Sequence, residues 1–302
     1  MADIIGIGAS VFDNLMLAEG FPIEDTKLKA ISSKIQGGGP CATALVAAVK
    51  LGASAAYLGL LGDDIFGCHM LEEFRRYGVE CDQTRIVKGA CSFNCFILVN
   101  KSNSSRTVVW NHGTLPPMDK ADIPLEKLKA AKYLHLDGNH IDMAVFAAKK
   151  AREFSVKVSL DAGSTYPGIE GLLPFVDVLI PSEEFVRAVS AKKTPEEGAE
   201  FIFSRYKPEV FIVTQGAKGG FIFNGKEFVR YKSFPVEAVD TNGAGDTFHG
   251  AFLAGMVRGM ELKEAVNFAS AAAALKCRGF GARESIPSYE ETIKAMKEEA
   301  PK

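Results

Sequence analysis

The chain has 302 residues, of which 47% are hydrophobic and 24% charged, and its 35 basic and 37 acidic residues give a formal net charge of −2. Because there is no basic tract, this balance argues against nucleic acid or an anionic membrane as the main partner. No apolar run reaches the roughly 18 residues that a membrane-spanning helix needs, and Met1–Gly6 lacks the charged start of a signal peptide.

Cysteine usage indicates a reducing compartment. The six cysteines are scattered and form no Cys-x-x-Cys pair: Cys41, Cys68, Cys81, Cys91, Cys95 and Cys277. We therefore expect reduced thiols in a cytoplasmic protein, with neither a disulfide framework nor a zinc site.

The first residues predict the beginning of an α/β pattern. Residues 4–7 predict a buried strand, and Gly37-Gly38-Gly39-Pro40 opens an alanine-rich helix that we predict over 41–51. A predicted strand over 55–61 and a predicted helix over 66–77 follow.

Two segments depart from this rhythm. Segment 12–35 alternates apolar and polar residues around turn residues, and segment 92–112 contains a predicted hairpin with strands at 92–99 and 106–110. We expect the two segments to form a small sheet that projects from the main domain.

From residue 133 onward, predicted strands and helices alternate regularly. The predicted strands are 133–136, 157–160, 176–180, 210–214, and a hairpin of 221–224 with 227–231. The predicted helices are 143–154, 183–190, 195–206, 245–258, 262–276 and 288–298. This alternation predicts a parallel sheet with helices on both faces, which binds ligands beyond the carboxyl ends of its strands.

The clearest candidate for chemistry is the run Asp-Thr-Asn-Gly-Ala-Gly-Asp at 240–246, between a strand-like stretch (234–239) and a predicted helix. Glycines let successive amides converge, and a helix N-terminus adds a partial positive charge, so the run predicts an anion cradle. Asp246 is then a candidate general base for an attacking hydroxyl. The alternative is an ordinary helix start, where an acidic residue is favourable in any case.

The stretch from Asp240 to Phe248 resembles the signature of the ribokinase family, also called the PfkB carbohydrate kinases. Four more segments resemble the family's pattern in the same order: Gly38-Gly39 with the helix to Gly52, then 59–67, 213–220 and 269–276. The resemblance implies a ribokinase-like three-layer α/β sandwich, one domain over 1–302, with a central mainly parallel sheet. It also implies a small β-sheet lid formed by 12–35 and 92–112.

The resemblance implies an ATP-dependent kinase that phosphorylates a hydroxyl of a small sugar-like molecule. It makes Asp246 the catalytic base and makes the amides of Gly243, Ala244 and Gly245 an anion hole. Expected substrate contacts are Asp13, Gly38, Gly39, Thr43, Asn111 and Asn139. Expected nucleotide contacts are Ser182, Thr214, Gly216, Gly219, Ser270 and Ala274.

Cations and a partner subunit are also implied. Magnesium is expected because the phosphates need charge neutralisation, with Glu183 as an indirect contact. A site for a monovalent cation such as K⁺ is open at Asp240, Asn242, Gly281 and Ser285, which resemble the potassium loop of some relatives. In many members the lid forms a dimer interface, so a homodimer is expected.

The sequence departs from the family pattern at three places. Thr43 stands where an asparagine is common, and Pro40-Cys41 replaces small or basic residues. Ser182-Glu183-Glu184-Phe185 stands at the Asn-x-x-Glu motif, so Phe185 takes the Glu position unless the register slips to Glu184. These departures leave the acceptor and the metal ligands open.

The runs 37–40, 248–250 and 274–277 most resemble the family branch that contains sulfofructose kinase. A sulfonate needs a fixed cation or strong donors, and residues 137–140 contain no arginine, although Lys27 and Asn111 remain candidates. An uncharged sugar or a nucleoside fits equally well.

Other readings are a nucleoside kinase of the same fold, or a non-catalytic sugar- or nucleotide-binding relative. A dehydrogenase is disfavoured because Gly6-x-Gly8 lacks its third glycine at Val11. His112 and His140 follow predicted strand ends and are candidate substrate contacts. We expect His249 to pack behind Asp246, one helical turn away.

Overall fold

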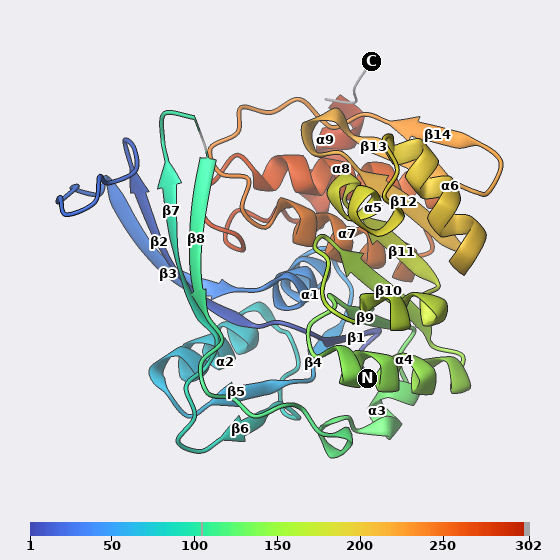
Figure 1. Ribbon diagram of the computed structural model, residues 1–302, viewed down its shortest axis with the longest axis horizontal. Helices are drawn as coiled ribbons and strands as arrows, with labels where there is room; N and C mark the ends of the chain where they lie inside the picture. The colour runs from blue at the N-terminus through green and yellow to red at the C-terminus, as the bar shows by residue number, and fades with distance from the viewer. Residues whose placement is uncertain (104, 299–302) are drawn as a thin grey trace.

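An eight-stranded sheet, mostly parallel, organises the described residues, which in this computed structural model are 1–103 and 105–298. Its strand order is β14-β13-β12-β11-β10-β9-β1-β4 (Figure 1). The bounds are β1 Ile4–Ile7, β4 Ala55–Tyr57, β9 Tyr133–Leu136, β10 Lys157–Ala162, β11 Val178–Pro181, β12 Val210–Thr214, β13 Gly220–Phe223 and β14 Phe228–Tyr231. The antiparallel pairs are β12 with β13 and β13 with β14. Position 104 of the second lid segment and positions 299–302 of the predicted domain lie outside the described residues.

Helices cover both faces of this sheet, as the alternating pattern predicted. The helices are α1 Pro40–Lys50, α2 Ile65–Tyr77, α3 Leu125–Lys129, α4 Ile141–Glu153, α5 Glu183–Ser190, α6 Pro195–Tyr206, α7 Ala244–Val257, α8 Leu262–Lys276 and α9 Tyr289–Glu298. Short 3-10 helices lie at Lys120–Asp122, Ile169–Gly171, Leu173–Phe175 and Gly216–Lys218. One apolar core contains buried residues of α3 to α6, and a second contains those of α1, α2, α7 and α8. The three-layer α/β fold is therefore confirmed.

The sheet contributes side chains to both cores, because its strands are apolar on both faces. In β1, Ile4 belongs to the second core, whereas Ile5 and Ile7 belong to the first. All four residues of β1 and of β11 are buried. This continuous burial is what a parallel sheet covered on both faces requires.

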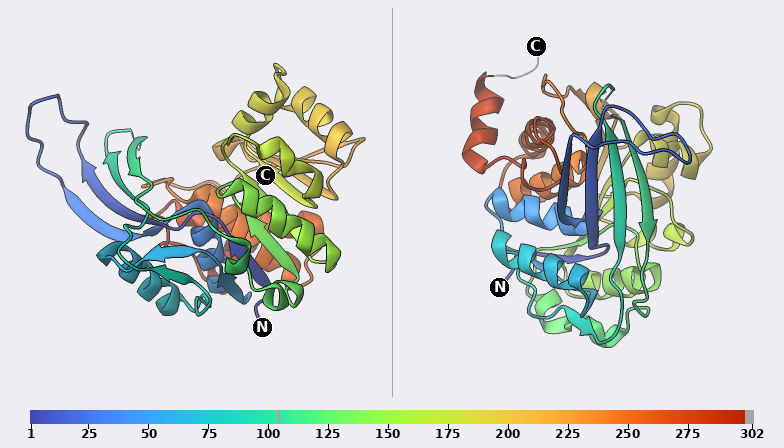
Figure 2. Two further views of the ribbon diagram at one scale, coloured as in Figure 1. Left: turned by 60° about the horizontal axis from the view of Figure 1, so that its bottom comes forward. Right: turned by 90° about the vertical axis from the view of Figure 1, so that its left-hand side faces the viewer.

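A separate four-stranded sheet projects from this body (Figures 1 and 2). It has the order β3-β2-β7-β8, with β2 Val11–Ala18, β3 Ser32–Gly38, β7 Asn94–Asn100 and β8 Ser105–Asn111. We call it the lid. Both segments that the sequence placed outside the main rhythm contribute to it. Among the described helices, none combines the length and the apolar character needed to cross a bilayer.

Two predicted strands differ from the structure. The predicted strand over 55–61 is divided: β4 ends at Tyr57, and β5 Leu60–Gly62 pairs with β6 Arg85–Val87 in a two-stranded sheet. Residues 234–239 form no strand, since the structure gives them no ladder partner there. Instead, the amides of Val239 and Asp240 donate to the carbonyl of Cys277 at 2.8 and 3.2 Å. An apolar run alone does not reveal whether the segment pairs with a neighbouring strand.

A buried arginine joins the base of the lid to the C-terminal part of the chain. The fully buried guanidinium of Arg283 donates to the Glu73 carboxylate (3.0 Å) and to the Gly38 carbonyl (2.8 Å). Glu73 in turn accepts the amide of Gly37 at 2.7 Å. A Cβ at position 37 would come within 2.1 Å of the guanidinium, so the first glycine of the Gly37–Gly39 run makes room for this ion pair.

Removing one partner of this pair should be costly, because it leaves a buried charge uncompensated. We predict that Arg283→Ala lowers the free energy of unfolding by about 3–5 kcal/mol. The exposed pair of Arg230 with Glu196 is the matched control, and Arg230→Ala should cost less than about 1 kcal/mol. Urea denaturation measures both. Equal costs for the two variants would contradict the structural role given to Arg283.

Candidate active site

The glycine-rich turn before α7 is built around Gly243. This residue has φ 77° and ψ 8°, the left-handed conformation that glycine adopts without strain, and it caps α7. The carboxylate of Asp240 fixes the start of the turn, because it accepts the amides of Asn242 (2.8 Å) and Gly281 (2.9 Å). The first amides of α7 have no acceptor within the helix, and such a helix start binds anions.

Close packing against α1 holds α7 in place. A Cβ at Gly250 would lie 2.1 Å from the Ala44 carbonyl oxygen and 2.8 Å from the Ala47 side chain. Only glycine permits this approach of the two helices. The position of the cradle thus depends on small residues one to two turns further along α7.

A cavity of about 740 Å³ lies between the lid and the end of the central sheet. We call it the acceptor cavity. The lid lines it with Val11, Asp13, Phe93, Cys95, Ile97, Arg106, Val108, Trp110 and His112. The body lines it with Ala9, Gly39, Pro40, Asp137, Asn139, Asp161, Gly163, Ser164, Tyr166 and the turn residues 241–246.

Asp246 lies in the first turn of α7 at this cavity. Burial, reinforced by the negative charge of Asp161, raises the pKa of Asp246 to about 7. The imidazole of His249 lies one helical turn further and opposes this shift. A carboxylate with a pKa near neutrality is suited to accept a proton from a hydroxyl.

Asp161, at the end of β10, pairs with His249 behind Asp246. The Nε2 atom of His249 is 3.2 Å from Oδ1 of Asp161, and both side chains are buried. Burial acts to raise the pKa of Asp161, but His249 and the amide of Gly163 outweigh it and hold the pKa below its usual value. His249 thus packs behind Asp246, as expected, and it also stabilises the negative charge beside the candidate base.

Two further carboxylates line the acceptor cavity. Asp13 on β2 is 4% exposed, and its Oδ1 accepts a hydrogen bond from the thiol of Cys95 at 3.0 Å. Burial raises the pKa of Asp13 to about 6. Asp137 accepts the amides of Ala9 (2.8 Å), Cys41 (3.1 Å) and Asn139 (2.9 Å), so its carboxylate also ties β9 to the start of α1.

Gly38 and Gly39 shape the cavity floor by their lack of side chains. A Cβ at Gly38 would lie 2.1 Å from the Asp13 carboxylate, and a Cβ at Gly39 would lie 2.5 Å from the Ala9 carbonyl. Gly39 also has φ 89°, which disfavours any other residue. Their lack of a side chain therefore leaves room for the Asp13 carboxylate and the Ala9 carbonyl. Gly39 itself lines the cavity.

A second cavity, of about 410 Å³, lies on the other side of the glycine-rich turn. We call it the nucleotide-side cavity. It brings together five of the six predicted nucleotide contacts: Thr214, Gly216, Gly219, Ser270 and Ala274. The 3-10 turn after β12 and the apolar residues Phe234, Pro235, Val236 and Ala238 complete it. Gly219 is required there, because its Cβ would lie 2.2 Å from the Tyr231 carbonyl.

The two cavities meet at the cradle. Thr241, Ala244 and Gly245 line both of them. A Cβ at Gly245 would meet no described atom within 4 Å, so packing gives no reason for a glycine in this helical turn. Glycine costs a helix roughly 0.5–1 kcal/mol relative to alanine. The glycine at position 245 would be explained by a transferred group that passes between the two cavities and closely approaches the backbone there.

Three predicted substrate contacts do not line the acceptor cavity: Gly38, which lies against Asp13, and also Thr43 and Asn111. Thr43 is fully buried in α1, and its hydroxyl accepts a hydrogen bond from Nε of Arg283 at 3.3 Å. Asn111 is exposed, and its Oδ1 accepts the amide of Gly113. Side chains alternate along β8, so Trp110 and His112 face the cavity and Asn111 faces away. His140 also lies outside, where it caps α4 with φ 52°.

The predicted magnesium and phosphate contacts are held in structural roles. The hydroxyl of Ser182 caps α5 by accepting the amide of Phe185 (3.1 Å), and it donates to the Gly163 carbonyl. Glu183 accepts hydrogen bonds from Arg187 and Gln215, both at 3.3 Å. Phe185 is 1% exposed and belongs to the core, whereas Glu184 is exposed. Neither Ser182 nor Glu183 lines either cavity.

Arg106, Asp161 and Tyr166 are cavity residues that the sequence reasoning missed. Arg106 reaches from the lid to the turn, where it donates to the Thr241 hydroxyl at 3.2 Å. Alternation with Trp110 in the predicted strand could have identified it. Asp161 directly follows the predicted strand 157–160, as Asp137 follows 133–136. The rule that ligands bind beyond the carboxyl ends of parallel strands could therefore have identified it. Tyr166 carries no such signal.

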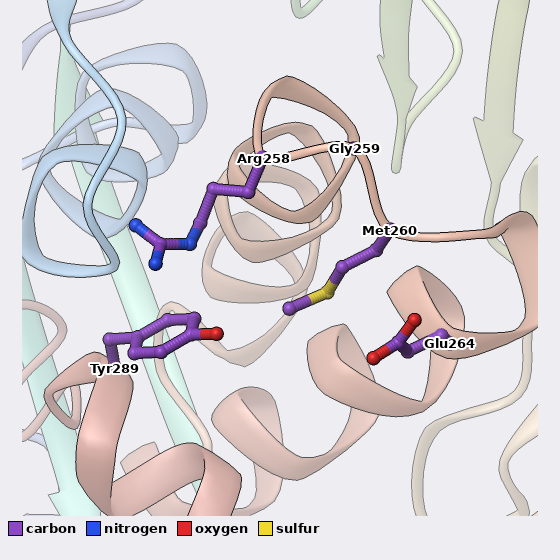
Figure 3. A pocket seen from close by; sticks show the side chains of 5 residues that line it. All are labelled: Arg258, Gly259, Met260, Glu264 and Tyr289. Atoms are coloured by element: carbon purple, nitrogen blue, oxygen red, sulfur yellow. The ribbon is translucent and has the colours of Figure 1, made fainter.

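A further hollow lies on the opposite part of the body, where α7 meets α8 and α9. Figure 3 shows its lining residues Arg258, Gly259, Met260, Glu264 and Tyr289. The guanidinium of Arg258 lies over the Tyr289 ring at 4.0 Å, a packing interaction between helix ends. No predicted site residue lies there, so this hollow is not the candidate site.

Comparison with known proteins agrees with this geometry. The chain is 27% identical to the ribokinase of Haemophilus influenzae over 96% of this chain and 97% of that protein. It is 26% identical to the ketohexokinase of Mus musculus over 91% of this chain and 95% of that one.

Solved structures give the same result. A putative ribokinase from Agrobacterium tumefaciens superposes with a TM-score of 0.92 at 27% identity, over 98% of this chain and 97% of that one. The ribokinase of Arabidopsis thaliana, complexed with ribose and ATP, superposes with a TM-score of 0.85 at 25% identity, over 98% and 99%. The sequence model for pfkB family carbohydrate kinases matches residues 1–289. The chain therefore belongs to the pfkB family of carbohydrate kinases and is an ATP-dependent sugar phosphotransferase.

Proposed function

We propose that the acceptor sugar binds in the acceptor cavity, that ATP binds in the nucleotide-side cavity, and that the γ-phosphate crosses between them at the cradle. The observation that carries this assignment is the wall of Thr241, Ala244 and Gly245 that the two cavities share. Any group held at the first amides of α7 is within reach of ligands on both sides.

In this proposal, Asp246 accepts the proton of the attacking acceptor hydroxyl. The amides of Gly243 and Gly245 stabilise the negative charge on the transferring phosphoryl group, as donors at a helix start can. The amide of Ala244, which donates to the Thr241 carbonyl at 3.2 Å, joins them when it exchanges that partner for the phosphoryl group. The lid covers the acceptor cavity and keeps water from the γ-phosphate. The contact of Arg106 with Thr241 supports this, because it brings a lid side chain to the place of transfer.

Magnesium would enter with the nucleotide. Within the described residues, no group of three histidine, cysteine or acidic side chains is arranged to hold a metal ion. Mg²⁺ keeps several waters and commonly binds through substrate phosphates with few protein ligands. Neutralising the phosphates is the chemistry it supplies. Glu183 would act through water, since it lines neither cavity; Arg187 and Gln215 both donate to its Oε2 atom.

The charges around the acceptor cavity favour an uncharged acceptor. Of its described lining residues, four are carboxylates, namely Asp13, Asp137, Asp161 and Asp246, against the single guanidinium of Arg106. Carboxylates accept hydrogen bonds from sugar hydroxyls and repel phosphate or sulfonate groups. The ring centroids of Phe93, Trp110 and His112 lie 4.6 to 6.0 Å apart. Together these rings offer a surface for a sugar ring or a nucleoside base.

The first prediction concerns the base. Asp246→Asn should bind ATP but lose phosphoryl transfer by at least about a hundredfold, the scale of general-base catalysis. ADP release is measured over a panel of neutral sugars, their phosphates and nucleosides. Asp142→Asn, an exposed acid in the first turn of α4, is the matched control and should keep wild-type turnover. Undiminished transfer by Asp246→Asn would refute the role of Asp246. Wild-type preference for the phosphorylated sugars would refute the neutral acceptor.

The second prediction concerns pH. Because the base must be ionised and its pKa lies near 7, kcat/KM should fall below about pH 7 and level off above it. The raised pKa also makes stability depend on pH. The pKa of this aspartate is roughly 4 in the unfolded chain and about 7 in the folded protein. The unfolded chain therefore releases the proton first, and the free energy of unfolding falls as pH rises between these values. The melting temperature of Asp246→Asn should therefore rise relative to wild type between pH 5 and pH 8. A constant difference would contradict the raised pKa.

We also propose a homodimer formed through the outer face of the lid. Opposite the cavity, Ile35, Phe96 and Val109 lie in one cross-strand row with Asn14. Phe96 is 59% and Val109 67% exposed. Exposed apolar side chains gathered on one face, here with Asn14 between them, are typical of an interaction surface. A second copy of the lid, which presents the same apolar row, is a complementary partner.

The dimer can be tested by sedimentation. The wild type should sediment at twice the 32.5 kDa chain mass, and Phe96→Glu should sediment as a monomer, because a charge cannot be buried there without a partner. Ile65→Glu, at an isoleucine of α2 that is 77% exposed outside the lid, should remain dimeric. A monomeric wild type would exclude this interface.

A cytoplasmic location is part of the proposal. All six cysteines are free, and free thiols that are mostly buried are usual in a reducing compartment.

A further inference from the structure

A lysine with a charged group lies wholly inside the protein beneath the cradle. Lys276 is the last residue of α8 and is 0% exposed. Its ammonium donates to the main-chain carbonyl of Asp240 at 2.8 Å. Burying an ammonium is expensive, and an apolar side chain of similar length would fill the same space at lower cost. Packing alone therefore does not account for a lysine at this position.

The hydrogen bond fixes the peptide from which the cradle starts. The Cys277 carbonyl accepts the amides of Val239 and Asp240, at 2.8 and 3.2 Å, while the Lys276 ammonium holds the Asp240 carbonyl. The end of α8 thus binds both polar groups of Asp240's backbone. Gly243, whose conformation sets the first amides of α7, follows three residues later.

The ammonium also places a positive charge near the place of transfer. Burial lowers the pKa of Lys276, and the carboxylates of Asp240 and Asp246 act against that shift. Two neighbours of Lys276 on the same helix end, Ala274 and Cys277, line the nucleotide-side cavity. A positive charge that interacts with Asp246, on the helix end that lines this cavity, would favour the phosphoryl group as it gains negative charge.

The residues expected to bind a monovalent cation are engaged with one another. Both carboxylate oxygens of Asp240 accept backbone amides, from Asn242 and Gly281. The Ser285 hydroxyl donates to the Gly281 carbonyl at 3.3 Å, and the Asp240 carbonyl is taken by Lys276. These oxygens therefore do not fit a K⁺ site, which would need several of them turned toward one ion.

We propose that Lys276 is a positioning residue that acts as the protein's own fixed cation beneath residues 240–245, so that phosphoryl transfer requires no added monovalent cation. The proposal rests on the kinase function proposed above. It assigns to one side chain both the hydrogen bond that sets the cradle and the charge that an external ion would otherwise bring.

The decisive variants are Lys276→Met, which keeps the length and removes the charge, and Lys276→Ala, which leaves room for a small amine. Both should lose about tenfold to a hundredfold in kcat, the scale of one hydrogen bond from a charged group, with KM for ATP much less affected. Ethylammonium or propylammonium should partly restore Lys276→Ala. Lys50→Met is the matched control, since the Lys50 ammonium also donates to backbone carbonyls, those of Arg283 and Glu284 outside both cavities.

Wild-type turnover by Lys276→Met would overturn the proposal. So would a loss in Lys276→Ala that no amine restores and that accompanies an equal loss of stability, because that pattern describes packing. If the variants do not fold, the wild type still decides: its rate should be the same in K⁺, Na⁺ and tetramethylammonium salts, and strong activation by K⁺ would refute the inference.

Failure of the kinase function can be told apart from failure of this inference. A wild type that phosphorylates no acceptor refutes the proposed function. The role of Lys276 has a separate readout, the melting temperature with bound nucleotide. MgADP with aluminium fluoride should raise the melting temperature more than MgADP alone does. This further increase requires the cradle but no acceptor. Lys276→Met should lose that increase, and an undiminished increase would overturn the role of Lys276.

Discussion

The left-handed turn at Gly243 is the constraint on which the site depends. It ends the irregular segment after β14 and begins α7, so that the first amides of the helix stand between two cavities. Three separate contacts hold this turn: Gly250 against α1, the Asp240 carboxylate on the amides of Asn242 and Gly281, and the Lys276 ammonium on the Asp240 carbonyl. A helix start is a general anion site, and here the surrounding packing gives it one fixed position with a ligand space on each side.

Buried charge is concentrated around this turn, and each charge has an identified partner. Asp137 is satisfied by backbone amides, Asp161 by His249, and Arg283 by Glu73 and the Gly38 carbonyl. Burial also raises the pKa of Asp137, and it raises that of Asp13 to about 6. The pKa of Asp246 rises to about 7, because the charge of Asp161 adds to its burial. A group held in this way is poised to take up a proton. What distinguishes Asp246 from the other raised carboxylates is its place in the first turn of α7, beside the cradle.

The sequence predicted the layered fold and the lid because both depend on periodicity and on glycine-rich helix starts, which are local signals. Several of the predicted nucleotide contacts, such as Thr214 and Gly219, line one cavity, since they lie close together in the chain. The sequence failed where tertiary partners decide. Thr43 is turned inward by Arg283, a residue 240 positions away, and Asn111 is one residue out of phase with the inward-facing Trp110. The contact of Arg106 with Thr241 depends on the lid folding over the turn, although alternation with Trp110 could have indicated its face. Residues 234–239 pair with no described strand, and their last amide donates to the carbonyl at the end of α8 instead.

The central claim is that acceptor and nucleotide lie on opposite sides of one wall made by Thr241, Ala244 and Gly245. It is tested most directly by a crystal structure of the protein with a non-hydrolysable ATP analogue and an accepted sugar. We predict the analogue's terminal phosphate at the amides of residues 243–245, and one sugar hydroxyl at roughly 2.6–3.2 Å from the Asp246 carboxylate. A nucleotide bound elsewhere, or a sugar with no hydroxyl near Asp246, would contradict the account.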